Sequence, residues 1–201
     1  DVRQPWTVRE IDRIPTAHRL RVANPDGRGP VVVNAPLTNA TTTGPDYRGH
    51  TPLVDYPPTT WQRELISDAN EGVVHGIYIT DWDNDGRDEI LTASFVGLHL
   101  FKLTKSGAWQ RTEISKGDPA PWPKGGSSDV AVGQTRKTRF LAVIEPWHGH
   151  QTVIYRQNKR VWQRQVIDSS LVEGHTILTA DLDGDGRDEV VAGFRGKGRS
   201  V

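Results

Sequence analysis

The sequence contains 201 residues, of which 25 are basic and 25 acidic, so the formal net charge is zero. This balance argues against a nucleic-acid or membrane partner selected by bulk charge. The chain has no cysteine, which excludes a disulfide framework and a thiolate zinc site, and no apolar run approaches the roughly 20 residues of a membrane span. Any site for a borderline transition metal would therefore have to use histidine.

A repeat of about fifty residues runs along the chain. Each copy carries a tryptophan that is followed five residues later by an isoleucine, and these tryptophans are Trp6, Trp61, Trp109 and Trp162. Each copy also contains an alternating apolar run, a polar turn and a β-branched run, which together indicate short strands. Four short strands in a repeat of about 40 to 50 residues are typical of a β-propeller blade.

The repeat predicts an all-β fold, namely a partial β-propeller of four-stranded blades over residues 1–201. In chain order, the predicted parts are an outer strand of a preceding blade at 5–11, blades at about 15–66, 72–114 and 126–167, and an incomplete blade at 173–201. A β-sandwich is the alternative, but it does not predict a tryptophan in phase with every repeat. So few blades do not easily close a ring, and we expect further blades or domains from the same full-length protein.

Two repeats contain an acidic loop, "DWDNDGRDE" and "DLDGDGRDE". Alternate aspartates around a sharp glycine turn bring oxygen atoms to one point, as Ca²⁺ requires, and the predicted ligands are Asp81, Asp83, Asp85, Asp88, Asp181, Asp183, Asp185 and Asp188. An EF-hand is excluded, because Thr92 and Ala192 stand where it needs a glutamate. An Asp/Gly hairpin without metal is the alternative. The equivalent loops "NPDGRGP" and "GQTRKTR" lack these carboxylates and are expected to be empty.

Three of the seven histidines occupy one repeat position, six residues ahead of the turn, and they are His18, His75 and His175. The first strand of each propeller blade lines the central channel, so side chains at one repeat position should converge around the axis. The third blade has Ser128 at this position, but the loop "EPWHGH" follows its second strand and is expected to bring His148 to the same place.

Converging neutral imidazoles suit Zn²⁺ or another divalent transition metal, and a catalytic zinc keeps one position open for water or substrate. A lone histidine at a strand end is more often a surface residue, and we interpret the out-of-phase His50 and His99 in this way. His150 is open to both interpretations. Glu145 is open to three: a metal ligand, a general base or an ordinary carboxylate at a strand end.

The chain resembles the β-propeller domain of the aldos-2-ulose dehydratase/isomerase family of fungal carbohydrate enzymes, which also act on 1,5-anhydrofructose. The resemblance is carried by "AHRL" (17–20), "VVHGIYI" (73–79), "GAWQR" (107–111), "EPWHGHQTVIY" (145–155) and "EGHTILTADLDGDGRDEVVAG" (173–193). It implies a seven-bladed propeller, combined elsewhere in the family with cupin and lectin-like domains, and a zinc at the bottom of a cleft. It also implies functional roles for His18, His75, His148 and His175, with Glu145 beside them.

These observations favour a metal-dependent lyase that dehydrates a ketose or anhydroketose sugar, with His18, His148 or Glu145 as the catalytic groups. The first alternative is a calcium-stabilised module that binds sugar or protein through exposed Trp82, Trp122 and Trp147, and a polysaccharide lyase is a weaker one. We expect a small sugar as partner, with no nucleic acid and no membrane. A secreted or periplasmic location is expected, since millimolar calcium is found there.

Overall fold

The computed structural model describes residues 3–197. All regular structure in this range is β-strand. Accordingly, the described residues include no helix long and apolar enough to cross a membrane.

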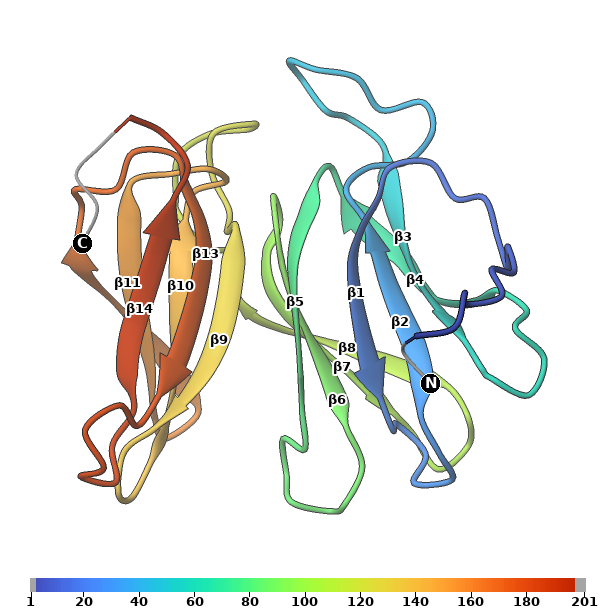
Figure 1. The fold of residues 1–201 in the computed structure, drawn as a ribbon. Helices are drawn as coiled ribbons and strands as arrows, with labels where there is room; N and C mark the ends of the chain where they lie inside the picture. The colour runs from blue at the N-terminus through green and yellow to red at the C-terminus, as the bar shows by residue number, and fades with distance from the viewer. Residues whose placement is uncertain (1–2, 198–201) are drawn as a thin grey trace.

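The strands form consecutive antiparallel sheets, each in simple chain order (Figure 1). The first sheet contains β1 (Ala17–Ala23), β2 (Val31–Pro36), β3 (His50–Tyr56) and β4 (Glu64–Glu71). The second contains β5 (Val74–Thr80), β6 (Glu89–Ser94), β7 (Gly97–Leu103) and β8 (Trp109–Ser115). The third contains β9 (Asp129–Gln134), β10 (Arg139–Glu145), β11 (Gln151–Asn158) and β12 (Val161–Asp168). The fourth has two described strands, β13 (Gly174–Ala180) and β14 (Glu189–Phe194). The predicted all-β class with four-stranded sheets is confirmed.

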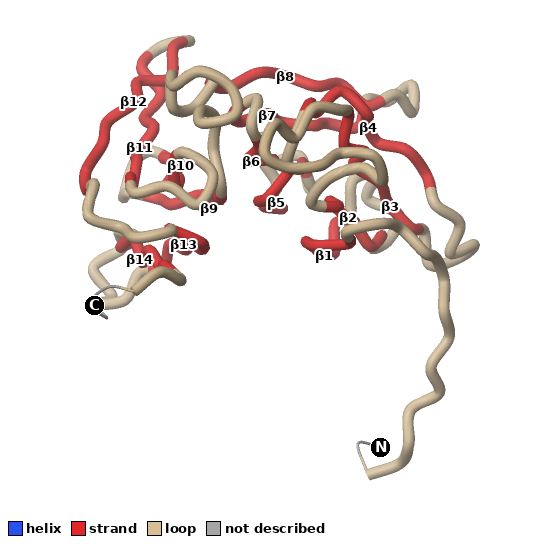
Figure 2. The backbone as a smooth tube through the Cα atoms, turned by 90° about the horizontal axis from the view of Figure 1, so that it is seen from above, coloured by secondary structure: helices blue, strands red, loops and turns tan. Residues whose placement is uncertain are grey.

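Seen from above, the sheets follow one another in an arc (Figure 2). The first strands β1, β5, β9 and β13 lie on its inner side and contact one another in sequence, whereas β4, β8 and β12 lie on its outer side. The repeat tryptophans mark the beginning of these outer strands, since Trp109 opens β8, Trp162 is the second residue of β12, and Trp61 shortly precedes β4. The phase of the sequence repeat therefore matches the phase of the sheets.

The core consists of apolar layers between successive sheets. Ile90 and Leu91 are neighbours in β6 and both are fully buried, but Ile90 packs toward the first sheet and Leu91 toward the third. Successive side chains of a strand point to opposite faces, so a sheet covered on both faces needs a continuous apolar run. This explains why β10 has five consecutive buried apolar residues at 140–144, while the outer strands β8 and β12 are largely exposed and polar.

Residues 5–11 are assigned to no strand in the described chain, in contrast to the expected outer strand. Trp6 is 80% exposed and Val8 is 92% exposed. An outer strand forms by pairing with the third strand of its own blade, and no such neighbour lies beside this segment among residues 3–197. Its place in a preceding blade stays a prediction.

Replacing Leu141 by alanine tests the layered core. Leu141 is fully buried in the layer between the second and third sheets, so its truncation should lower the free energy of unfolding by about 2–5 kcal/mol. Leu182→Ala is the matched control, because this leucine is 64% exposed and its loss should cost less than about 0.5 kcal/mol. Urea unfolding of both variants measures the difference, and equal losses would contradict the packing described.

Candidate functional site

Three histidines meet at one end of the inner strands. His75 belongs to β5, His175 belongs to β13, and His148 lies in the loop after β10. Nε2 of His148 lies 3.3 Å from Nε2 of His75 and 3.3 Å from Nδ1 of His175. The ligand nitrogens of all three lie within 4.8 Å of one another. Of the four histidines expected to converge, the structure brings these three together.

His75 is held in one orientation by the third blade. Its Nδ1 lies 3.1 Å from the carbonyl oxygen of Ser128, and the ring is 1% exposed. We assign the proton to Nδ1, which donates to this carbonyl, so that Nε2 presents a lone pair to His148. Ser128 occupies the repeat position where the other blades have histidine, and it serves as an orienting partner. Outer partners of this kind fix the tautomer of metal-binding histidines.

His148 is placed by its neighbours rather than by a strand. Its backbone adopts a positive φ of 47°, which returns the loop toward the inner strands. The ring of Trp147 stacks on it at 4.5 Å with an interplanar angle of 26°. One proton can satisfy only one of the two nitrogen contacts that Nε2 of His148 makes. The arrangement therefore brings lone pairs together that hydrogen bonds alone do not satisfy.

The spacing of these nitrogens fits a tetrahedral metal. For Zn–N bonds of about 2.0–2.1 Å, tetrahedral geometry places two ligand nitrogens about 3.3 Å apart. Both contacts to His148 have this length. Three protein nitrogens also leave a coordination position for water or substrate, as in catalytic zinc sites.

The electrostatics keep the imidazoles neutral. Burial, followed by the charge of Arg19, lowers the pKa of His75 to about 2. Burial, followed by the charge of Arg195, lowers the pKa of His148 to about 4, and burial also lowers the pKa of His175. Neutral imidazole is the form that binds metal, so the group is in its ligating state at neutral pH.

His18 lies beside this group rather than in it. Its ring centroid is 4.8 Å from that of His75, but its nitrogens are not among those that converge. The side chain is exposed, and partial burial lowers its pKa ahead of the effect of Arg19. The structure therefore places a largely neutral imidazole next to His75, outside the set of converging nitrogens.

Glu145 lies in a different environment from the one a base or ligand requires. Its carboxylate is fully buried and accepts hydrogen bonds from Tyr155 Oη at 2.7 Å, Ser127 Oγ at 3.0 Å and Arg164 Nε at 2.8 Å. It does not join the histidine group in the described chain. The arrangement favours the third interpretation, a structural carboxylate, because its oxygens already serve the interior of the third blade.

Arg19 is a central residue that the sequence pattern did not single out. Its Nε donates to the carbonyl oxygen of His75 at 2.9 Å, and its Nη2 donates to that of His175 at 3.5 Å. The same guanidinium lies 3.7 Å from Asp129 of the third blade. Arg19 thus links the inner strands of four sheets. Its position directly after His18, a histidine of the repeat, is the sequence feature that could have identified it.

Gly76 makes this close approach possible. A Cβ at this position would lie 2.5 Å from Oδ1 of Asp129 and 2.9 Å from the carbonyl oxygen of Ser128. Real Cβ atoms do not come so near, so β5 and β9 require glycine here.

The histidines outside the repeat phase separate into two kinds. His50 and His150 are exposed, as a surface interpretation of them requires. His99 is 2% exposed and its Nδ1 has no hydrogen-bond partner among the described residues, so the surface interpretation is wrong for His99. Burial, followed by the charge of Arg111, lowers its pKa to about 4. His99 lies in β7, between sheets, where sequence phase alone does not reveal burial.

The acidic loops lie at the other end of the same strands. Carboxylates gather there in two groups, Asp81 with Asp83 and Asp85, and Asp181 with Asp183 and Glu189. In the first group an internal cation is already present, because Nζ of Lys102 lies 2.6 Å from Asp83 and 2.8 Å from the buried Glu89. In the second, the neighbouring Arg136 and Arg187 pair with Asp185 rather than with these three carboxylates. Sequence reasoning missed Lys102, Glu89 and Glu189.

Asp88 and Asp188 were expected as calcium ligands, but they stand outside both groups. Oδ2 of Asp88 accepts from the backbone N–H of Asn24 at 2.7 Å, and its own N–H donates to the carbonyl of Asn24 at 3.0 Å. Asp188 makes the same pair of bonds with Gln134, both at 2.8 Å. These aspartates join one blade to the preceding blade. Asp185 also lies outside its group, near Arg136 and Arg187.

The tryptophans expected to be exposed are all partly buried. Trp147 packs on Tyr47 at 5.3 Å besides stacking on His148. Trp122 donates from Nε1 to the carbonyl of Asp46 at 2.6 Å. The ring of Trp147 therefore supports His148, whereas Trp122 packs on Phe95 and holds the loop at Asp46. Trp82 lies at the other end of the sheets.

Comparison with known proteins identifies the family of the chain. Residues 1–158 match the family described as aldos-2-ulose dehydratase, β-propeller domain. The chain is also 29% identical over 226 aligned positions to the aldos-2-ulose dehydratase of Phanerodontia chrysosporium, with 98% of this chain and 25% of the relative covered. It thus spans about a quarter of the length of that curated relative. The match over residues 1–158, together with sheets arranged as blades, shows that the chain belongs to the aldos-2-ulose dehydratase β-propeller family.

Proposed function

We propose that the chain is the propeller part of a sugar dehydratase, in which His75, His148 and His175 bind a zinc-type transition metal. The observation that carries the proposal is the pair of 3.3 Å contacts made by Nε2 of His148, which have the spacing of ligands around one tetrahedral ion. The family match supports the reaction class. A bound metal would supply Lewis-acid polarisation of a sugar carbonyl, which acidifies the neighbouring C–H bond.

The residues of this chain would then carry the proton chemistry. His18 is exposed, neutral and adjacent to the group, so it is our candidate for the base that accepts the proton from the carbon next to the carbonyl. Hydroxide leaves from the following carbon and is released as water after gaining a proton, so that a C=C bond forms. Arg19 would hold the backbone of His75 and His175, and Trp147 would hold the ring of His148. Glu145 has no step.

Calcium is a separate, structural part of the proposal. We propose that the loop at Asp181, Asp183 and Glu189 binds Ca²⁺, because these three carboxylates converge and the arginines beside the loop pair with Asp185 instead. The loop at Asp81–Asp88 would bind it more weakly, since Lys102 already neutralises Asp83 and Glu89. A calcium-stabilised binding module remains the second candidate function, favoured if calcium is the bound metal and no transition metal binds.

Replacing His175 by alanine tests the transition-metal site. The change removes one of three ligands from a partly exposed position, so zinc affinity should fall at least about tenfold while the melting curve stays close to that of the parent. Equilibrium dialysis with elemental analysis measures the affinity. His150→Ala is the control, because this exposed histidine lies outside the group and its loss should leave zinc binding intact. Unchanged zinc affinity in His175→Ala would rule out the proposed site.

Thermal unfolding with and without calcium tests the loops. At 10 mM calcium the midpoint should rise by roughly 5 °C, because a cation bound only by the folded state stabilises it. Asp183→Asn should remove most of this rise, whereas Asp83→Asn should remove little, since Lys102 already occupies that loop. Equal losses from the two variants would contradict the distinction between the loops, and the absence of any rise would contradict calcium binding.

A further inference from the structure

A pocket of about 550 Å³ lies between the second and third blades, away from the histidines. It is formed by the loop that follows β5 and the loop that follows β9, together with the start of β12. His75 is near the start of β5 and Trp82 comes just after its end, so the pocket and the histidine group lie at opposite ends of the same strands. It belongs to neither the proposed transition-metal site nor the carboxylate groups.

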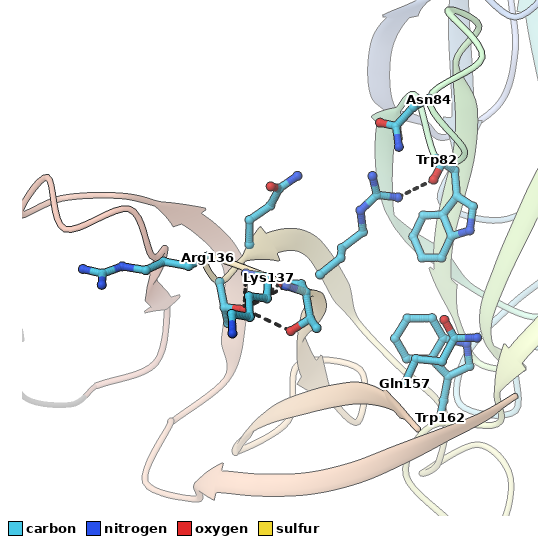
Figure 3. A pocket seen from close by; sticks show the side chains of 10 residues that line it. Trp82, Asn84, Arg136, Lys137, Gln157 and Trp162 are labelled. Carbon is cyan, nitrogen blue, oxygen red and sulfur yellow. Dashed lines mark hydrogen bonds between the residues drawn. The ribbon is translucent and has the colours of Figure 1, made fainter. Parts of the chain in front are cut away.

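One wall of the pocket is aromatic. The rings of Trp82 and Trp162 lie 5.9 Å apart with an interplanar angle of 46°, and they come from neighbouring blades. Both are partly exposed and line the pocket (Figure 3). Adjacent tryptophan rings offer a wide apolar surface on which the C–H face of a pyranose can pack.

The lining of the pocket is also cationic. Arg136, Lys137 and Arg139 line the pocket, and no carboxylate does so among the residues described. Arg139 is fixed against the aromatic wall, since its guanidinium donates to the carbonyl of Trp82 and lies 5.0 Å from that ring centroid. Arg136 is held by the carbonyl of Asp185 at 2.8 Å. The ammonium of Lys137 makes no ion pair within residues 3–197, and it is exposed beside the pocket (Figure 3).

The positive charge of this loop is specific to the third blade. The second and fourth blades have acidic loops where the third has "GQTRKTR". The chain as a whole has zero net charge, so this loop is a local concentration of positive charge, which a binding role would explain. The remaining lining includes amides and hydroxyls, such as Gln157 and Thr135, which suit the hydroxyl groups of a sugar.

We propose that this pocket binds an acidic saccharide, with a sugar face against Trp82 and Trp162 and a carboxylate paired with Lys137. The inference is independent of the proposed catalytic site. A ligand with both an apolar face and a negative charge matches an aromatic wall together with a free ammonium, and neither a neutral sugar nor a small inorganic anion uses both.

Calorimetric titration of the full chain with trigalacturonate tests the proposal. Tryptophan fluorescence provides a second, independent measure of binding. The parent protein should bind trigalacturonate at least about threefold more tightly than the methyl-esterified trisaccharide, with loss of the difference in high salt. Lys137→Ala should weaken trigalacturonate binding by at least about threefold and Lys137→Glu should weaken it further. Lys124→Ala is the matched control, because this exposed lysine is outside the pocket and removes the same charge.

The remaining outcomes separate the alternatives. His175→Ala should bind trigalacturonate as the parent does, since the histidine lies at the other end of the strands. Equal weakening by Lys137→Ala and Lys124→Ala, or no binding of trigalacturonate, would overturn the proposal. Inorganic sulfate or a nucleoside monophosphate that binds more tightly, with the same dependence on Lys137, would overturn the saccharide assignment.

Discussion

The apolar layers between successive sheets are the constraint on which the rest of the structure depends. The second and third sheets are covered on both faces, so Ile90 and Leu91 of one strand belong to different layers. This packing fixes how far one sheet is rotated from the next, and so it places the inner strands side by side. Residues at one repeat position then meet near the concave side of the arc. Arg19 adds polar bonds to this arrangement, because it reaches the carbonyl groups of His75 and His175.

The two ends of the inner strands have different chemistry. At one end, burial and the nearby Arg19 keep His75 neutral, which suits a ligand for a borderline metal. At the other end, carboxylates gather at the turns and either meet an internal ammonium, as at Lys102, or remain without a cation partner in the described chain. The histidine group and the acidic turns are therefore separated by about the length of one strand. The basic loop of the third blade lies at this second end, where the second and fourth blades have acidic loops.

Much of the fold could be predicted because residues close together in the sequence define the repeat. The position of Trp61, Trp109 and Trp162, the acidic turns and the position of His75 and His175 depend only on spacing, and the structure places them accordingly. The segment at 5–11 shows the limit of this reasoning, since a strand exists only when a neighbour pairs with it. The carboxylate of Glu145 shows another, because spacing does not tell whether a side chain faces the axis or the interior of its blade.

The roles that sequence reasoning missed depend on contacts between distant segments. Ser128 orients His75 from another blade, and Lys102 approaches the first acidic loop from β7. Asp88 matches the spacing of a calcium ligand but joins two blades through Asn24. Local patterns identify which residues are able to perform a given chemistry. The partner that each side chain meets is decided by the packing of the sheets, which a linear pattern does not encode.

The most direct test of the central claim is X-ray absorption at the zinc edge, measured on the chain with one equivalent of zinc. The account predicts a first shell of at least three nitrogen ligands at about 2.0–2.1 Å with the multiple-scattering signature of imidazole. An oxygen-only shell would place the ion at the carboxylate loops instead, and it would contradict a metal site formed by His75, His148 and His175.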